Sequence, residues 1–315
     1  MAIYNAYDAI GQREDLTDVI YNISPTETPF MSSIGKTKAT AVYHEWQTDS
    51  LAAATTANAA VEGADASDAT LSPTTRLGNY TQILQKTIKV SGTLDAVNKA
   101  GRKSEKAYQL AKASQELKRD LETILLSNQG QATGSSNSGA RKMGSLLSWI
   151  KTNSSAQTNG GDPTTIGVST RTDGNTRTFT EALLKEVVAE VFVSGGSPTV
   201  LMVGAAGKQK VSSFAGIGET RFNVTGAKPS TIIGAADIYV SDFGNMSVVP
   251  NRFMRTRDAL ILDPEYAAIA YLRPFMTNEL AKAGDSDKTQ VLVECTLEVK
   301  NEAAHGIVAD LNMAL

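Results

Sequence analysis

The side chains that most often carry out chemistry are sparse in this sequence and lie far apart. It contains two histidines, His44 and His305, and one cysteine, Cys295. A zinc-type site needs more ligands at closer spacing, so we expect neither a metal site nor histidine-based catalysis, and His44 is interpreted as a structural or interface residue. Cys295 alternates with Val293 and Leu297, which favours a small apolar core residue over a nucleophile.

A glycine-rich turn at residues 204–209, GAAGKQ, lies between an expected strand and an expected helix, as phosphate-binding loops do. It lacks the GxxxxGK[ST] spacing and has Gln209 where a metal-binding hydroxyl belongs. Hydrolase GxSxG and zinc-protease HExxH motifs are absent. Glu62, Asp65 and Asp68 are as dense as the acids of a calcium loop but lack its ligand order, so a solvated loop is favoured. The sequence predicts no enzyme and no cofactor.

A small basic cluster precedes the longest predicted helix and consists of Lys99, Arg102, Lys103 and Lys106. Most such clusters are solvated, and the sharper interpretation is weak contact with DNA phosphates that does not depend on base sequence. The chain as a whole adds no electrostatic attraction for nucleic acid, because its net charge is -3 and its pI is about 5.6.

Composition sets the broad class of protein. A chain of 315 residues suggests about two domains, and its 41% hydrophobic content suffices for a sizeable core. The single cysteine excludes an internal disulfide framework and fits a reducing cytosol. No apolar run approaches the roughly 20 residues that span a bilayer, and the N-terminus lacks the regions of a signal peptide. We therefore expect folding in a cytoplasm, without a membrane segment.

One long helix is predicted at residues 104–128, which contain no Gly or Pro and many strong helix formers. Ser104 is its expected N-cap, and Gly130 follows its end. Small or apolar side chains recur at three- and four-residue steps. They are Ala107, Leu110, Ser114, Leu117, Leu121 and Ile124. A helix of this length spans roughly 37 Å. Its apolar face is narrow, so we expect a sheet on one side and solvent or a large polar partner on the other.

The segment before this helix predicts protrusions. Residues 1–35 have the character of an arm, with an amphipathic helix at 13–20 and a short helix that begins at Thr28 and Pro29.

Residues 36–95 predict a hairpin. Residues 40–47 and 79–91 alternate as strands do, and residues 50–68 between them are small and acidic, which predicts an extended or mobile tip. A lone hairpin is marginal in water, so we expect a partner to cover it.

The second half of the chain predicts a mixed α/β region after a long insertion. Residues 130–178 are rich in Gly, Ser, Asn and Thr and predict an inserted surface feature around a short apolar anchor at 143–149. Thr178 and Glu181 form a capping-box pattern for a helix that ends near Val193. Strands are expected at 199–203, 232–240, 247–250, 259–263, 267–272, 290–300 and 306–309, and a further helix at 205–214.

The order of these segments resembles the major capsid proteins of tailed double-stranded DNA bacteriophages, which have the Hong Kong 97-like fold, and short motifs resemble their SU-ten-type subfamily. The motifs are DLTDVI (15–20), SPTETPF (24–30), EWQTD (45–49), VEGAD (61–65), RLGNYTQ (76–82), KVSGT (89–93), GRKSEKAY (101–108), ELKRD (116–120), VKNE (299–302) and AHG (304–306). The likeness covers the first 130 residues best and the C-terminal strand next.

The resemblance implies an α+β capsid fold with the following organisation. An N-terminal arm spans 1–35, an E-loop hairpin 36–95, a peripheral domain 96–178 with the spine helix 104–128 and the insertion 130–178, an α/β axial domain 179–258, and return strands of the peripheral domain 259–315.

The resemblance also implies a structural protein that assembles through pentamers and hexamers into an icosahedral or prolate shell around packaged double-stranded DNA. The same likeness implies assembly in the host cytoplasm, with portal and decoration proteins as further partners and with either a separate scaffolding protein or none. We expect hairpin residues to contact neighbouring subunits and to become buried only on assembly. These residues are Glu45, Trp46, Asp49, Arg76, Ile83, Leu84 and Lys86.

Two other functions stay open at this point. A cellular encapsulating shell of the same fold would store cargo enzymes in place of DNA. An α/β enzyme built on residues 179–310 would need a cluster of titratable groups in a pocket, and the sequence offers no such cluster.

Overall fold

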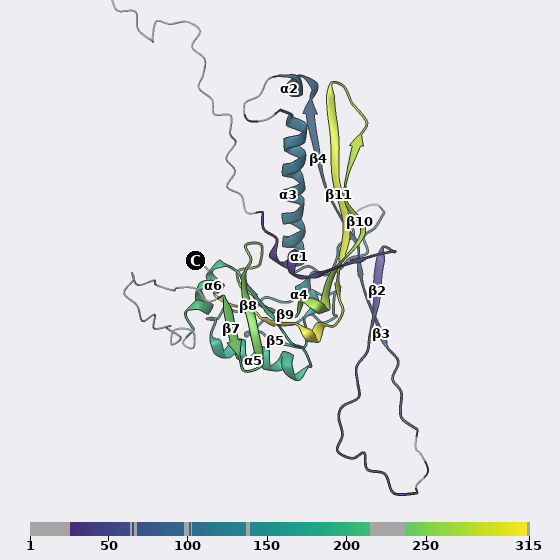
Figure 1. Cartoon of the computed structure of the whole chain (residues 1–315), viewed down its shortest axis with the longest axis vertical. Coiled ribbons are helices and arrows are strands. Elements are labelled where there is room, and N and C mark those ends of the chain that lie inside the picture. The colour runs from purple at the N-terminus through teal and green to yellow at the C-terminus, as the bar shows by residue number, and fades with distance from the viewer. Residues whose placement is uncertain are drawn as a thin grey trace, which may run out of the picture.

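The computed structural model describes residues 26–315 except 64, 66–67, 98–100, 102, 137–138, 215–236 and 314–315. Figure 1 shows an elongated molecule in which a long helix and an upright sheet rise from a smaller α/β body, while a hairpin extends the opposite way. The amphipathic helix expected at residues 13–20 lies outside the described residues.

The upright sheet has four strands in the order β1 (Gly35–Lys38), β10 (Ala267–Leu280), β11 (Ser286–Val299) and β4 (Gln82–Ser91). β1 runs parallel to β10, and the other pairs are antiparallel. α3 (Glu105–Leu125) packs along β4 and β11 and is the predicted long helix, with the Ser104 hydroxyl accepting from the Ala107 N–H at 3.3 Å. A short helix, α2 (Gly92–Ala96), joins β4 to the segment before α3.

The buried face of α3 explains its position. Ala113, Leu117, Leu121 and Leu125 lie at helical spacing and are at most 4% exposed. They belong to the same core cluster as apolar side chains of β11, including Val293 and Leu297. The opposite face is polar, as the narrow apolar stripe predicted.

The lower body is a six-stranded sheet with helices against it. Its strand order is β5 (Ser154–Ser155), β12 (Gly306–Val308), β9 (Ala259–Leu262), β6 (Val200–Val203), β8 (Gly244–Pro250) and β7 (Ile238–Ser241). α5 (Glu181–Val193) and α6 (Ala205–Ser212) contribute Leu184, Val187 and Val211 to its core. Two 3₁₀ turns, Pro264–Tyr266 and Glu302–Ala304, flank the strands that connect to the upright sheet.

Two local predictions differ from the structure. The helix α5 begins at Glu181 with Thr180 as N-cap, and the expected Thr178–Glu181 capping box does not form. The reason is that Glu181 is the first residue of the helix and not the third, as a capping box requires. Its carboxylate instead accepts from Tyr239 and pairs with Lys185 at 3.0 Å. The strand expected at residues 232–240 is present as β7, which starts at Ile238, and Asp237 before it is not part of the strand; residues 232–236 lie outside the described residues.

The largest correction concerns the strand expected at residues 79–91. The structure has two strands there, β3 (Thr75–Tyr80), which pairs with β2 (Tyr43–Thr48), and β4, which pairs with β11. Thr81 lies between the two strands and is fully buried. Its N–H donates to the Val42 carbonyl and its hydroxyl donates to the Glu294 carboxylate, so its polar groups bond outside the ladder of either strand. The hairpin therefore ends at Tyr80, and the strand after it belongs to the upright sheet.

A buried carboxylate joins the two parts of the molecule. Glu122 of α3 is 0% exposed and accepts hydrogen bonds from the backbone N–H groups of Phe30 and Met31, at 2.7 and 2.9 Å, and from Asn251 Nδ2 at 2.7 Å. Phe30 and Met31 belong to α1 (Pro29–Ser33), the helix predicted at Thr28 and Pro29, and Asn251 follows β8. Burial raises the pKa of Glu122, and these three hydrogen bonds oppose the rise.

We predict that Glu122→Gln lowers the free energy of unfolding of the unassembled subunit by about 1–3 kcal/mol, because the amide NH2 would face the Met31 N–H and leave a buried donor unpaired. Urea unfolding measures the change. The matched control is Glu116→Gln on the same helix, whose half-buried ion pair with Lys86 is worth no more than about 1 kcal/mol. Equal losses in the two variants would contradict the bridging role.

Candidate assembly interface

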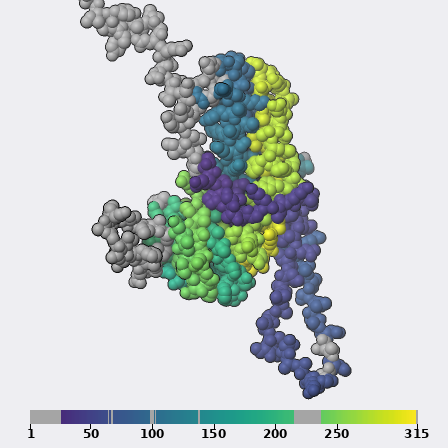
Figure 2. Space-filling model, viewed as in Figure 1, coloured from purple at the N-terminus to yellow at the C-terminus, as the bar shows by residue number. Residues whose placement is uncertain are grey.

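The β2–β3 hairpin carries a long loop that its own chain leaves uncovered. Among the described residues of 49–74 there is no helix or strand, and Leu51, Val61 and Leu71 are 99%, 78% and 88% exposed. Figure 2 shows the hairpin as a thin projection beside the compact body. Exposed aliphatic side chains at this density on a slender projection indicate an interaction surface.

The base of the hairpin, in contrast, is fixed to the body by aromatic and ionic contacts. The Trp46 ring lies 5.2 Å from the Trp149 ring, centroid to centroid. His44 Nε2 lies 3.2 Å from the Glu298 carboxylate on β11, and Thr37 on β1 donates to the same carboxylate at 2.8 Å. These contacts hold β2 across the end of the upright sheet.

Asn79 fixes the other strand of the hairpin. Its side chain is 0% exposed, donates to the Gly144 and Leu297 carbonyls at 3.0 and 2.8 Å, and accepts from the Gly144 N–H at 2.7 Å. Beside it, Glu294 accepts from the Thr81 hydroxyl and pairs with Arg141 and Arg273 at 2.6 and 2.7 Å. The direction of the projection is thus set by contacts within one chain.

The insertion at residues 130–178 supplies several of these contacts. Trp149 lies in its short helix α4 (Leu146–Trp149), which with Met143 forms the predicted apolar anchor; both side chains are at most 1% exposed. Ser145 ties this anchor to the end of α3, because its hydroxyl donates to the Ser127 carbonyl and accepts from the Gln129 N–H at 2.9 Å. The structured part of the insertion is therefore a support for the hairpin.

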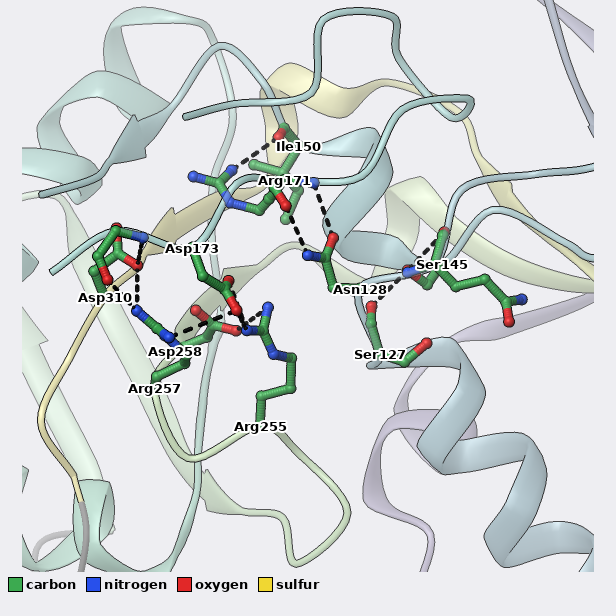
Figure 3. A network of polar contacts seen from close by, with 12 residues as sticks. Ser127, Asn128, Ser145, Ile150, Arg171, Asp173, Arg255, Arg257, Asp258 and Asp310 are labelled. Carbon is green, nitrogen blue, oxygen red and sulfur yellow. Dashed lines mark hydrogen bonds and ion pairs between the residues drawn. The ribbon is translucent and has the colours of Figure 1, made fainter. Parts of the chain in front are cut away.

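A polar network holds the rest of the insertion on the lower body (Figure 3). Asp173 accepts from Arg255 at 2.5 and 2.7 Å, and Asp310 accepts from Arg257 at 2.9 Å and from the Gly174 N–H at 2.7 Å. The side-chain amide of Asn128, after α3, donates to the Arg171 carbonyl at 2.8 Å and accepts from the Arg171 N–H at 2.9 Å. The network connects α3, the insertion, the β8–β9 loop and the segment after β12.

Asp258 is the most perturbed carboxylate of this network. It is 2% exposed and lies 3.3 Å from Arg255 Nη1. Burial raises its pKa to about 6, while the charges of Arg255 and Arg171 oppose the rise. By contrast, hydrogen bonds from Arg255 lower the pKa of the more exposed Asp173.

The residues predicted at the subunit interface fall into two groups. Glu45 and Arg76 pair across the hairpin at 3.0 Å, Asp49 is exposed at its end, and Trp46 is half-buried against the body. An interface role for these four stays a prediction.

The other three lie on β4, in the upright sheet. Ile83 is 43% exposed, but Leu84 is only 9% exposed within its own chain, which differs from the expected burial on assembly. Lys86 pairs with Glu116 and Asp120 of α3, each at 3.1 Å. These three residues lie in the upright sheet and not in the hairpin because the chain changes sheets at Thr81.

The basic cluster is only partly described. Lys103 is exposed, whereas Lys106 pairs with Glu279 of β10 at 2.8 Å. Lys99 and Arg102 lie outside the described residues. A DNA-facing role for the cluster stays a prediction.

Two of the reactive side chains, Cys295 and His305, are fully buried. Cys295 is 0% exposed and burial raises its pKa to about 12, so it is the predicted core residue. His305 is also fully buried, burial lowers its pKa to about 4, and its Nδ1 accepts from the Asp263 N–H at 3.3 Å. Within the described part of the chain, no three His, Cys, Asp or Glu side chains are grouped to hold a metal ion.

None of the helices in the described ranges has the length and apolar character needed to cross a bilayer.

Sequence reasoning missed the buried polar residues that fix the hairpin, which are Asn79, Thr81 and Glu294, and those that connect the parts of the body, which are Glu122 and Asp258. Each is a single polar residue inside or beside an apolar pattern, and its partners are distant in sequence. Periodicity carries no signal for such contacts. The alternation that places Val293, Cys295 and Leu297 inward puts Glu294 on the opposite face, so the sequence offered no signal for its burial.

Comparisons with known proteins agree with this architecture. Residues 3–312 match the profile of a family described as SU10 major capsid protein. A protein of Escherichia phage Phieco32 described as major capsid protein is 28% identical over 345 aligned positions, which cover 97% of this chain and 96% of the relative.

Solved structures show the same fold. The cyanophage A-1(L) capsid asymmetric unit aligns with a TM-score of 0.67 at 12% identity and covers 95% of this chain and 97% of the other. The holo-SrpI encapsulin complex from Synechococcus elongatus aligns with a TM-score of 0.55 at 11% identity and covers 100% and 98%. The family match and the fold likeness confirm the predicted α+β, Hong Kong 97-like capsid fold and the structural role in a phage capsid shell.

Replacement of Asn79 by Ala is expected to cost about 1–3 kcal/mol of subunit stability, because it removes three hydrogen bonds and leaves the buried Gly144 N–H unpaired. Hydrogen exchange at residues 43–48 and 75–80 will speed up as the hairpin loosens. Gln47→Ala is the control, since Gln47 is exposed and its side chain accepts a hydrogen bond from Thr74 of the same hairpin. Unchanged exchange in Asn79→Ala would contradict the anchoring role.

Asp258 predicts a pH dependence of stability. Its folded pKa of about 6 lies above the ordinary 3.8, so its protonated form stabilises the fold below about pH 4 and this contribution is lost as pH rises through 6. The loss amounts to about 3 kcal/mol for this shift. The free energy of unfolding of wild type minus that of Asp258→Asn, followed from pH 4 to 7, will therefore fall. The difference also cancels the opposite trend from His305. A flat difference would contradict the burial of Asp258.

Proposed function

Because the chain belongs to the SU10 major capsid protein family, we propose that its subunits form pentamers and hexamers and close an icosahedral or prolate shell around double-stranded DNA. The hairpin supports this proposal most directly. It is a well-anchored projection that ends in a loop with three largely exposed aliphatic side chains. A surface of this kind is stabilised when a neighbouring subunit covers it.

The domain organisation is part of the same proposal. The N-terminal arm is residues 1–35, and the E-loop, given the break at Thr81, is the hairpin with its loop up to Tyr80. The peripheral domain comprises the upright sheet, the spine helix α3 and the return strands from residue 259. The six-stranded sheet and its helices form most of the axial domain, which corresponds to residues 179–258. In this arrangement Glu122 and the polar network of the insertion connect the two domains.

The charged residues of the hairpin set the register between neighbouring subunits and add little to the affinity of assembly, because exposed ion pairs contribute little net free energy. Glu45 and Arg76 neutralise each other within the hairpin. The loop itself keeps an uncompensated negative charge, since residues 49–74 include four carboxylates and no Lys or Arg. A partner surface for this loop therefore carries positive charge.

We assign the interior of the shell to packaged DNA without sequence specificity. The support is the net charge of -3, which leaves the wall weakly repulsive to DNA overall, with Lys103 and its neighbours as the local exception. Such a wall encloses DNA without binding it tightly. The chain is assigned a structural role and no catalytic one. Assembly takes place in the host cytoplasm, and separate scaffolding, portal and decoration proteins are further partners.

The likeness to an encapsulin structure favours one alternative function, a shell that stores cargo proteins in place of DNA. At 11% identity this likeness concerns the fold alone, and the family match favours the phage capsid. Shells purified from infected cells distinguish the two contents: nucleic acid absorbing at 260 nm supports a DNA container, and stoichiometric foreign protein without nucleic acid supports storage.

Deletion of residues 52–70 tests the role of the loop. The subunit will keep its fold, because the hairpin base is anchored by Trp46, His44 and Asn79, but it will not form closed shells. Electron microscopy of the purified variant, with circular dichroism as the control for folding, gives the result. Normal shells of normal thermal stability would refute the proposed E-loop function.

A further inference from the structure

A groove opens beside α1. It has a volume of about 570 Å³ and lies between α1, α3 and β10. Its apolar surface comes from Met31, Tyr271 and Phe275, and its rim carries Lys36 of β1 and Lys118 of α3. This volume falls within the range of pockets that enclose a small ligand or a few residues of a peptide.

The two lysines of the groove are available for a partner. Lys36 and Lys118 are exposed, and neither forms an ion pair with any carboxylate that the structure describes. None of the residues that line the groove is acidic. The groove therefore combines an apolar surface with two uncompensated positive charges, and it fits an apolar, acidic peptide segment.

The tip of the hairpin loop has this chemistry. Val61 is 78% exposed, Glu62 follows it directly, and Gly63 with a φ of +78° turns the chain after them. Asp65 is also exposed. An aliphatic side chain beside two carboxylates matches an apolar groove with two lysines in both polarity and charge.

The loop cannot reach this groove within its own chain. In Figure 1 the hairpin extends away from the body on the side opposite α3, while α1 lies where α3 meets the body. The contacts of His44, Trp46 and Asn79 fix that direction. A loop in the groove must therefore come from a second copy of the chain.

We propose that the groove between α1, α3 and β10 is the docking site for Val61, Glu62 and Asp65 of a second copy. Val61 packs against Met31 and Phe275, and the two carboxylates pair with Lys36 and Lys118. The inference rests on the proposed shell function and adds to it the receiving surface. It also gives α1 a role, because Glu122 holds the backbone of Met31 at the floor of the groove.

Disulfide trapping in assembled shells tests the contact. Ser32 lines the groove, is exposed, and sits on α1; the native Cys295 is fully buried and will not interfere. Shells of Val61→Cys/Ser32→Cys, oxidised and run on a non-reducing gel, will give a ladder of covalent multimers. The matched control, Val61→Cys/Ser213→Cys, places the second thiol at the exposed end of α6 and will stay monomeric.

Two results would overturn the assignment. One is normal shells in which the Val61–Ser32 pair gives no ladder. The other is a ladder of multimers from the Asp8→Cys/Ser32→Cys variant instead, which would show that residues 1–25 occupy the groove. Both leave the proposed function standing, whereas normal shells from the loop deletion would remove the function itself.

Charge reversal provides an independent test. Lys36→Glu/Lys118→Glu will lower the yield of shells about tenfold or more, since two favourable pairs become repulsive. Adding Glu62→Lys/Asp65→Lys in the same chain will restore the yield. The proposed ion pairs would be contradicted if the lysine variant loses shells, the fourfold variant does not regain them, and both subunits unfold like wild type.

Discussion

The buried carboxylate of Glu122 is the constraint on which the arrangement of the molecule depends. It lies where α3, α1 and the segment after β8 meet, and each of its three partners is a donor, so an ionised carboxylate satisfies all of them. An uncompensated carboxylate in such a site would be costly. The upright sheet, the N-terminal segment and the α/β body are therefore held in one relative position by a group that tolerates little change.

The contacts around this junction extend to the hairpin, whose base is fixed to the body and whose loop is exposed. The end of α3 is tied to the insertion through Asn128 and Ser127, and the insertion presents Trp149 and Gly144 to the hairpin. Contacts within one chain thus fix where the projection starts and where it points. The loop beyond Thr48 has few such contacts and exposes its aliphatic side chains. This combination of a fixed hairpin base and an exposed loop suits a shell protein, because the base sets the direction of the hairpin before assembly and the loop gains its contacts during assembly.

Much of the fold followed from periodicity. The helix at residues 104–128, the buried strand before residue 204 and the alternating strand β11 were predicted because one face of each is apolar, and that pattern is local. Cys295 and the anchor around Trp149 were placed correctly for the same reason. The break at Thr81 was not predicted, because residues 79–91 contain no Gly or Pro that would indicate it, and only the distant partner Glu294 reveals that the chain changes sheets there. The same reason moved Ile83, Leu84 and Lys86 from the hairpin to the sheet. The capping box at Thr178 does not form because the helix starts at Glu181, and the carboxylate of this residue contacts Tyr239 and Lys185 instead of the backbone N–H of Thr178.

The central claim is that the loop at residues 49–74 is uncovered in the free subunit and covered by a neighbour in the shell. Hydrogen–deuterium exchange, compared between unassembled subunits and closed shells, tests it most directly. The account predicts fast exchange of the loop amides in free subunits and strong protection in shells, while the hairpin base at residues 43–48 and 75–80 is protected in both. Equal, fast exchange of the loop in subunits and shells would contradict it.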